Sequence, residues 1–271
     1  MQTHPTKYST DLTDEEWNHI KSLVPAPKSG KGKRGRPVES DRRSLVNAIF
    51  YVVRAGCAWR LLPGDFPPWQ TVYGYYRRWS QDWTWTFIHD TLRNWLRKMA
   101  GRRMAPTAAI IDSQSVKTPD QAGERGYDAG KKIKGRKRHV AVDTLGLVLA
   151  IMITPAAVQD RDAAKTLIQG LVALCGRLQI IWADGGYLGT LVRWVKQLRP
   201  YGKLKLEIVR RCDQAKGFKV LPKRWVVERT FGWFFKSRRL CRDYEVRVDH
   251  SAAMLRICMI HIMVRRLAKA T

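Results

Sequence analysis

Three acidic residues are notable because each adjoins an apolar stretch in a chain that is otherwise strongly basic. Asp112 ends the run AAIID at 108–112, Asp184 follows the apolar run 178–183, and Glu228 lies within WVVERTFGW at 225–233. Carboxylate oxygens are hard ligands that suit Mg²⁺ or Mn²⁺. Three of them can hold two divalent ions about 4 Å apart, which activate a nucleophilic oxygen and stabilise a leaving oxygen at a phosphodiester.

Each acid also has a simpler explanation when it is considered alone. An aspartate after a strand is commonly a turn or cap residue. A glutamate in a basic helix commonly pairs with a cation four residues away. The occurrence of all three acids together favours a shared site, provided that the fold brings them to one place.

The two aspartates are expected to meet at one edge of a sheet. The β-branched and apolar runs 108–112 and 178–183 are predicted strands, and each is closed by its aspartate. Open α/β sheets bind ligands beyond the carboxyl ends of their strands. If the two strands are neighbours, Asp112 and Asp184 converge, and Glu228 must approach from a helix packed across the sheet.

The segment around Glu228 is predicted to be an amphipathic helix with two functional stripes. Val227, Phe231 and Phe234 recur at helical spacing and are expected to pack against the sheet. A second stripe, at about 100° per residue, combines the acid with a glycine and cations: Arg224, Glu228, Gly232, Lys236 and Arg239.

The remaining pattern after residue 104 alternates strands and helices. A hairpin is predicted from strands 138–143 and 147–153, followed by helix 160–175, helix 188–198, strand 204–209 and a last helix at 251–269. Asp143 is expected to form the hairpin turn, and Asp160 and Asp162 are expected to cap a helix. Residues 105–271 are therefore predicted to form an α/β domain.

Residues 1–100 are predicted to form a small helical domain. TDEE at 13–16 is a capping box, and further helices are expected at 40–55, ending at Gly56, at 71–80 and at 82–99. The segment 28–37 is a basic linker or DNA arm. The helices on either side of 56–68 form either a helix-turn-helix reader or a plain helical bundle.

Composition points to a polyanionic partner. The 271 residues include 50 Lys and Arg against 23 Asp and Glu, a formal net charge of +27, with 45% hydrophobic residues for a core. No apolar run approaches the roughly 18 residues of a membrane span, and the polar start indicates a cytoplasmic protein. The five cysteines are scattered, which argues against zinc and for reduced thiols.

With these motifs in place, the sequence resembles the DDE transposases of bacterial insertion sequences, of the IS5 and IS4 kind. The matching segments are IDSQSVK at 111–117, KGRKRH at 134–139, DTLG at 143–146, ADGGY at 183–187 and RWVVERTFGW at 224–233, with TDEEW at 13–17 and RLLP at 60–63 in the leading domain. The resemblance covers nearly the whole chain.

The resemblance implies an α/β, ribonuclease H-like catalytic core with a mixed five-stranded sheet, preceded by an all-helical DNA-binding domain. It implies that Asp112, Asp184 and Glu228 are the catalytic, metal-binding triad for two Mg²⁺ ions, which Mn²⁺ can replace. The enzyme would bind the inverted repeats of its element, cleave the ends and join the 3′-OH to target DNA. Its partners would be double-stranded DNA and further copies of the chain, as a homodimer or higher oligomer, at the bacterial nucleoid.

The chain departs from a related signature of spacing Y-x2-R-x3-E-x6-K. Arg224 fits the arginine relative to Glu228, but position 221 is leucine and the nearest lysine, Lys236, lies one position late. The stretch 209–224 is too short for the β insertion of some IS4-type relatives. Alternatives to a transposase are a ribonuclease H-like nuclease without strand joining and a catalytically silent DNA-binding repressor.

Clustered cations are the expected contacts to the DNA backbone, which binds protein without sequence choice. His139 is expected to contact DNA or to have a structural role rather than to act as a base. The predicted DNA-binding set is Arg77, Arg78, Lys131, Lys132, Lys134, Arg136, Lys137, Arg138, His139, Arg224, Arg229, Lys236, Arg238 and Arg239.

Overall fold

A computed structural model describes residues 6–26, 40–120, 123–198, 203–209 and 223–270. The chain divides into two compact units, and neither is continuous in sequence. A helical unit comprises residues 1–92, 236–240 and 253–271, and an α/β unit comprises residues 93–235 and 241–252. The predicted basic linker at 28–37 lies outside the described residues, as does Cys212.

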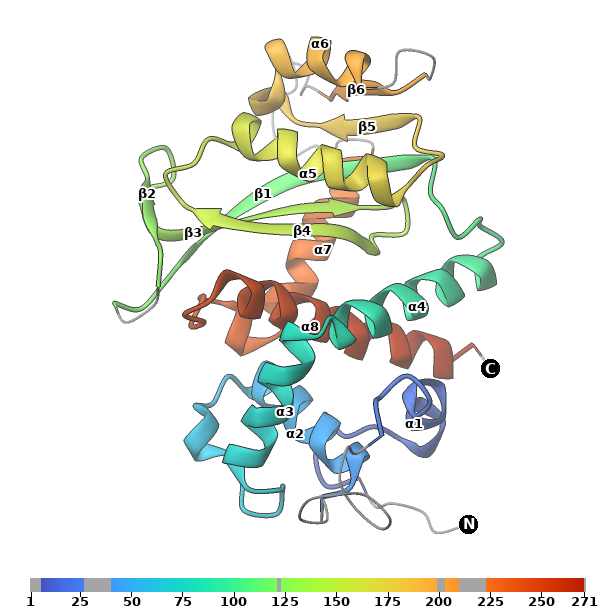
Figure 1. Ribbon diagram of the computed structural model, residues 1–271, viewed down its shortest axis with the longest axis vertical. Coiled ribbons are helices and arrows are strands. Elements are labelled where there is room, and N and C mark those ends of the chain that lie inside the picture. The colour runs from blue at the N-terminus through green and yellow to red at the C-terminus, as the bar shows by residue number, and fades with distance from the viewer. Residues whose placement is uncertain (1–5, 27–39, 121–122, 199–202, 210–222, 271) are drawn as a thin grey trace, which may run out of the picture. The chain divides into compact units, whose positions relative to one another are not determined.

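The helical unit contains the predicted N-terminal helices and part of the last one (Figure 1). Its elements are α1 (Asp14–Ile20), α2 (Arg42–Ala55), the short helix η1 (Trp59–Leu61), α3 (Trp69–Gln81), the start of α4 (Thr84–Met99), η3 (Arg238–Leu240) and the later part of α8 (Val248–Ala268). The sequence predicted a single boundary after residue 100. The ring of His261 on α8 stacks on Phe50 of α2 with centroids 4.4 Å apart, which joins this part of α8 to the N-terminal helices.

Local signals fix the ends of these helices as predicted. Thr13 and Glu16 form the reciprocal capping box of α1. Gly56 ends α2 with a left-handed φ of 76°, and a Cβ there would lie 2.8 Å from the Cβ of Arg238. The tight connection of this unit lies between α3 and α4, at Asp82 and Trp83, rather than between α2 and α3 where a helix-turn-helix was considered.

The α/β unit is built on a six-stranded mixed sheet (Figure 1). The strands are β1 (Ala108–Lys117), β2 (Gly126–Asp128), β3 (Ile133–Val142), β4 (Val148–Pro155), β5 (Ile180–Ala183) and β6 (Lys205–Ile208). Five of them follow the order β4-β3-β1-β5-β6, antiparallel across β4, β3 and β1 and parallel across β1, β5 and β6. This is the predicted ribonuclease H-like arrangement. The sixth strand is the three-residue β2 on β3, too short to show a periodic signal.

Helices cover both faces of this sheet (Figure 1). Helices α5 (Asp160–Leu174) and α6 (Thr190–Gln197) share one apolar cluster with Ala109 and Ile111 of β1. Because side chains alternate along a strand, Ile110 and Asp112 project to the opposite face. There α7 (Trp225–Phe235) packs against β1 and β3.

Two element boundaries differ from the sequence prediction. Strand β1 does not end at Asp112 but continues to Lys117, because its polar half pairs with β3 as far as Lys117 opposite Gly135. Helix α7 ends at Phe235, so Lys236 and Arg239 do not continue its predicted stripe and belong to the helical unit.

Candidate active site

Asp112 lies on β1, and Asp184 lies at the same level directly after the neighbouring parallel strand β5. The register pairs Ile110 of β1 with Trp182 of β5, and each aspartate lies two residues beyond its member of that pair. The predicted adjacency of the two strands is thus confirmed. Asp184 directly follows β5, whereas Asp112 lies within β1 where the pairing with β5 stops.

Main-chain hydrogen bonds orient both carboxylates. The N–H of Ser113 donates to Oδ1 of Asp112 at 2.7 Å, and the N–H of Gly186 donates to Oδ1 of Asp184 at 2.9 Å. A Cβ at Gly186 would lie 3.1 Å from that Oδ1, which explains the glycine. Each aspartate therefore keeps its Oδ2 for another partner.

That partner is one nitrogen of Arg224. Its Nη2 lies 3.7 Å from Oδ2 of Asp112, 3.8 Å from Oδ2 of Asp184 and 3.5 Å from Oε1 of Glu228. The three predicted acids come from two strands and a helix, yet each places one oxygen beside the same atom. The site is partly open, since the side chain of Asp112 is 15% exposed and that of Glu228 is 51% exposed.

Helix α7 is held in place by its predicted apolar stripe and by the turn between β3 and β4. Val227, Phe231 and Phe234 are all buried, as expected. The hydroxyl of Thr230 donates to the carbonyl of Gly146 at 2.9 Å, and Gly146 adopts a φ of 80°. This turn therefore fixes the helix from which Glu228 projects.

Arg229, a predicted DNA contact, is occupied by protein groups. Its guanidinium lies 4.4 Å from the ring centre of Trp225 and 4.9 Å from that of Trp233, and it donates to the carbonyl of Leu145 at 2.9 Å. Stacked and hydrogen-bonded in this way, Arg229 braces α7 against the β3–β4 turn.

Burial and neighbouring charges raise the pKa values of two groups at the site, Asp112 and Tyr187. The pKa of Asp112 is raised to about 6, chiefly by burial and in addition by the charge of Asp184, while the Ser113 N–H, Arg224 and Lys131 oppose the rise. Burial also raises the pKa of Tyr187 well above its usual range, with the charges of the nearby aspartates acting in the same direction.

Tyr187 was missed as a site residue by sequence reasoning. The residue is only 2% exposed, and the charges of Asp112 and Asp184 act on its hydroxyl. The available signal was its place directly after the Asp-Gly-Gly segment, where it closes the short helix η2 (Gly185–Tyr187).

Four residues of the basic run of β3 were predicted to contact DNA, and their burial in the structure contradicts this. Arg136, Lys137, Arg138 and His139 are all buried. Their partners are protein groups: Arg136 pairs with Asp243, Lys137 Nζ donates to the Val158 carbonyl, Arg138 donates to Gln114 and His139 bonds Thr154. Burial also lowers the pKa of His139 to about 4. These side chains are structural because no face of them is open to a phosphate.

Other predicted contacts are open to solvent. In the α/β unit these are Lys131, Lys132 and Lys134, and in the helical unit they are Arg77, Arg78, Lys236 and Arg238. Arg239 is half-buried and donates to the Cys57 carbonyl at 3.4 Å.

Asp143 has the structural role that the sequence predicted. Its Oδ1 accepts from the N–H groups of Leu145 and Leu147, and its other oxygen pairs with Arg97. Asp160 does not cap α5, since Gln159 occupies the cap position, but it lies 3.3 Å from Lys137 Nζ.

Comparison with known families decides the identity of this arrangement. A family model described as a transposase DDE domain matches residues 103–263, and one for putative transposases of the IS4/5 family matches residues 12–89. The chain belongs to the DDE transposases of insertion sequences. It is therefore an enzyme of a class that cleaves DNA and depends on divalent metal ions.

Individual proteins also match the chain. The transposase is 32% identical over 160 residues to a putative transposase for insertion sequence element IS402 of Burkholderia cepacia, covering 56% of this chain and 72% of that one. It is 28% identical over 124 residues to an uncharacterized 16.2 kDa protein of the same element, covering 45% and 78%. The crystal structure of the Mos1 strand transfer complex matches at 13% identity and a TM-score of 0.25, over 88% of this chain and 79% of that one.

The donor set of the site suits a divalent metal by its chemistry. Three hard carboxylate oxygens, Oδ2 of Asp112, Oδ2 of Asp184 and Oε1 of Glu228, surround a point at which a cationic nitrogen already lies. In both aspartates the other oxygen, Oδ1, accepts a main-chain N–H and so orients the group. Within the described residues, no three acidic, histidine or cysteine side chains stand close enough to share an ion as they are.

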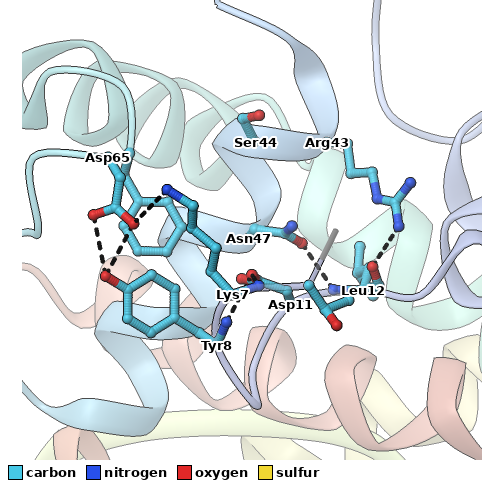
Figure 2. A pocket seen from close by; sticks show the side chains of 10 residues that line it. Lys7, Tyr8, Asp11, Leu12, Arg43, Ser44, Asn47 and Asp65 are labelled. Carbon is cyan, nitrogen blue, oxygen red and sulfur yellow. Dashed lines mark hydrogen bonds and ion pairs between the residues drawn. The ribbon is translucent and has the colours of Figure 1, made fainter. Parts of the chain in front are cut away.

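A hollow in the helical unit has a different character (Figure 2). Its polar groups bond to one another: the hydroxyl of Tyr8 donates to Asp65 at 3.1 Å, and the N–H of Leu12 donates to Oδ1 of Asn47 at 3.1 Å. These contacts tie the N-terminal segment to α2 and to the segment between η1 and α3, so the hollow has a structural role.

Membrane-spanning helices and disulfides are both absent from the described part of the transposase. None of its helices is long and apolar enough to span a bilayer. Among the described residues, Cys57, Cys175, Cys241 and Cys258 take part in no disulfide.

Proposed function

We propose that this transposase binds the terminal inverted repeats of its insertion sequence, cleaves the DNA ends and joins the freed 3′-OH to target DNA. The observation that supports this most directly is the convergence of Asp112, Asp184 and Glu228 on one cationic atom within 3.8 Å. Three acids from three elements, open on one side, form a site suited to a phosphodiester rather than a buried structural cluster.

In this proposal the three acids hold two Mg²⁺ ions, for which Mn²⁺ can substitute. Bound ions supply positive charge that activates an attacking oxygen and stabilises a leaving one. The chain's own part is to present the oxygens: Ser113 and Gly186 fix the two aspartates, and the β3–β4 turn fixes the helix of Glu228. Cleavage and joining are both phosphoryl transfers and can use the same site.

Exposed lysines beside the triad are proposed to contact the DNA backbone. Lys131 lowers the pKa of Asp112 through its charge, so it lies within electrostatic range of the site. Lys132 and Lys134 are exposed close to it along the chain. In the helical unit, Arg77 and Arg78 are proposed to bind the inverted repeats. Processing two ends together requires at least two protomers on bacterial DNA.

The test is an assay of the full chain on DNA that carries the element's ends, found by sequencing the DNA flanking the gene. With Mg²⁺ we expect cleavage and strand joining. Asp112→Asn, Asp184→Asn and Glu228→Gln should each lose both activities. Asp162→Asn, which changes an exposed acid on α5, is the matched control and should keep them.

The outcomes separate the proposal from its alternatives. Cleavage without joining identifies a plain nuclease, and binding without any chemistry identifies a repressor. Full activity in Asp112→Asn would refute the assignment of the triad.

A further inference from the structure

The position of Arg224 is unusual for a residue expected to contact DNA. Its Nη2 lies 3.5–3.8 Å from a carboxylate oxygen of each of Asp112, Asp184 and Glu228. A simple i, i+4 pair with Glu228 would explain one of these contacts, but not the two to acids on other elements. The side chain is only 18% exposed, so it lies inside the site rather than across its mouth.

Lys223, which directly precedes Arg224, helps to orient it toward the three carboxylates. Lys223 has a φ of 72°, a left-handed conformation that costs free energy for a residue other than glycine. Its ammonium lies 4.3 Å from the ring centre of Trp182, which is two residues before Asp184. The N–H of Val227 donates to the Arg224 carbonyl at 3.1 Å and thereby begins α7. Arg224 is thus fixed between a strained residue and the first turn of a helix.

Charge balance shows what this placement does. Ionised, the three carboxylates carry three negative charges, and the guanidinium, which stays protonated in proteins, offsets one of them. Two divalent ions together with Arg224 would bring five positive charges against three negative ones. A DNA phosphate adds negative charge and is a favoured bidentate partner for a guanidinium.

We infer that Arg224 is a built-in cation that holds the triad together before metal arrives, competes with divalent ions for it, and is released when a DNA phosphate binds the guanidinium. The inference rests on the proposed function of the triad. It makes metal binding and DNA binding mutually reinforcing, since each favours the state in which Arg224 has left the carboxylates. Such coupling is typically about 5- to 150-fold in affinity.

The experiment measures Mn²⁺ binding to the full chain by calorimetry and by electron paramagnetic resonance, with and without a short duplex of the element's end. Without DNA, Arg224→Gln should bind Mn²⁺ about tenfold more tightly than the wild type, a change within the usual range of coupling. Adding the duplex should tighten Mn²⁺ binding to the wild type but no longer to Arg224→Gln. Arg193→Gln, an exposed cation on α6, should behave as the wild type.

A second variant protects the test against misfolding. Arg224→Lys keeps the positive charge, so its Mn²⁺ affinity without DNA should stay close to that of the wild type. Unchanged or weaker Mn²⁺ binding in a folded Arg224→Gln would overturn the inference, as would a lysine variant that behaves like the glutamine variant.

Asp112→Asn separates this failure from failure of the proposed function. If Mn²⁺ binding persists undiminished in Asp112→Asn, the triad is not the metal site and the proposed function itself is wrong. If Asp112→Asn loses Mn²⁺ while Arg224→Gln changes nothing, only the role inferred for Arg224 fails.

Discussion

Replacing Arg136 by methionine tests whether the basic run of β3 serves the fold or the DNA. The Arg136 guanidinium is fully buried and donates to the carbonyls of Glu124 at 2.9 Å, Glu245 at 2.6 Å and Val246 at 2.8 Å. It also lies 3.3 Å from Asp243, which is equally buried. Methionine fills much of the same space but leaves a buried acid without its counter-charge.

The expected loss of stability follows from that unpaired acid. Removing one partner of a buried ion pair costs about 3–5 kcal/mol. Asp243 keeps hydrogen bonds from Ser251 at 2.6 Å and from the N–H of Glu245 at 3.0 Å, which favours the lower end of the range. A loss of about 3 kcal/mol lowers the Tm of a domain of this size by roughly 6–12 °C.

Lys134→Ala is the matched control, two residues earlier on the same strand but exposed. Its stability should change by no more than about 0.5 kcal/mol. If Lys134 contacts a phosphate, the slope of log affinity against log salt concentration should fall by about 0.9 in magnitude. Thermal unfolding by circular dichroism and DNA binding by fluorescence anisotropy over a salt series give the two readouts. An Arg136→Met protein with unchanged Tm and weakened DNA binding would refute the structural role.

Three further outcomes are expected. Gly146→Ala places a Cβ 3.0 Å from Nη2 of Arg229 at a φ of 80°. The change should lower the free energy of unfolding by about 1–2 kcal/mol and reduce DNA cleavage by displacing Glu228. An unaltered stability together with an unaltered cleavage rate would contradict this. Gly186→Ala should weaken Mn²⁺ binding several-fold by crowding Asp184, whereas Gly185→Ala, with open space at its Cβ, should leave Mn²⁺ binding unchanged. Equal effects of the two variants on Mn²⁺ affinity in calorimetry would count against the role of Gly186. Burial and two nearby arginines lower the pKa of His261 to about 3 in the folded protein. Below about pH 6.5 the unfolded chain therefore binds a proton at this histidine that the folded chain does not. The free energy of unfolding falls as the pH falls in that range, by up to ~1.4 kcal/mol per pH unit. His261→Phe should therefore lose less Tm than the wild type between pH 8 and pH 5 in a thermal scan, and parallel curves would disprove it.

The sequence predicted the strands that carry the two aspartates because apolar runs report burial well. It placed the end of β1 at Asp112, since the polar residues after it carry no hydrophobic signal. Backbone pairing with β3 is what extends the strand to Lys117, and pairing depends on a partner rather than on composition.

The basic side chains were harder to assign because charge alone predicts exposure. Arg136 is buried by partners more than 100 positions away in the sequence, which no local pattern reveals. Arg224 was predicted beside Glu228 from helical spacing, and that part is confirmed by the 3.5 Å contact. Its contacts with Asp112 and Asp184 arise from three separate elements and required the fold.

The composite make-up of the helical unit sets the order in which the two units can fold during synthesis. Helix α2 packs its Phe50 on His261, and Arg265 lies 3.7 Å from Glu16 of α1, so these early helices depend on residues of α8, which are made much later. A growing chain on the ribosome emerges from its N-terminus at about 5–20 residues per second. The part of α8 that belongs to the helical unit therefore emerges on the order of ten seconds or more after the N-terminal helices, whereas residues 93–235 can begin to pair as they emerge. The helical unit of a newly made molecule is thus completed only after residues 253–270 have left the ribosome, later than most of the α/β unit.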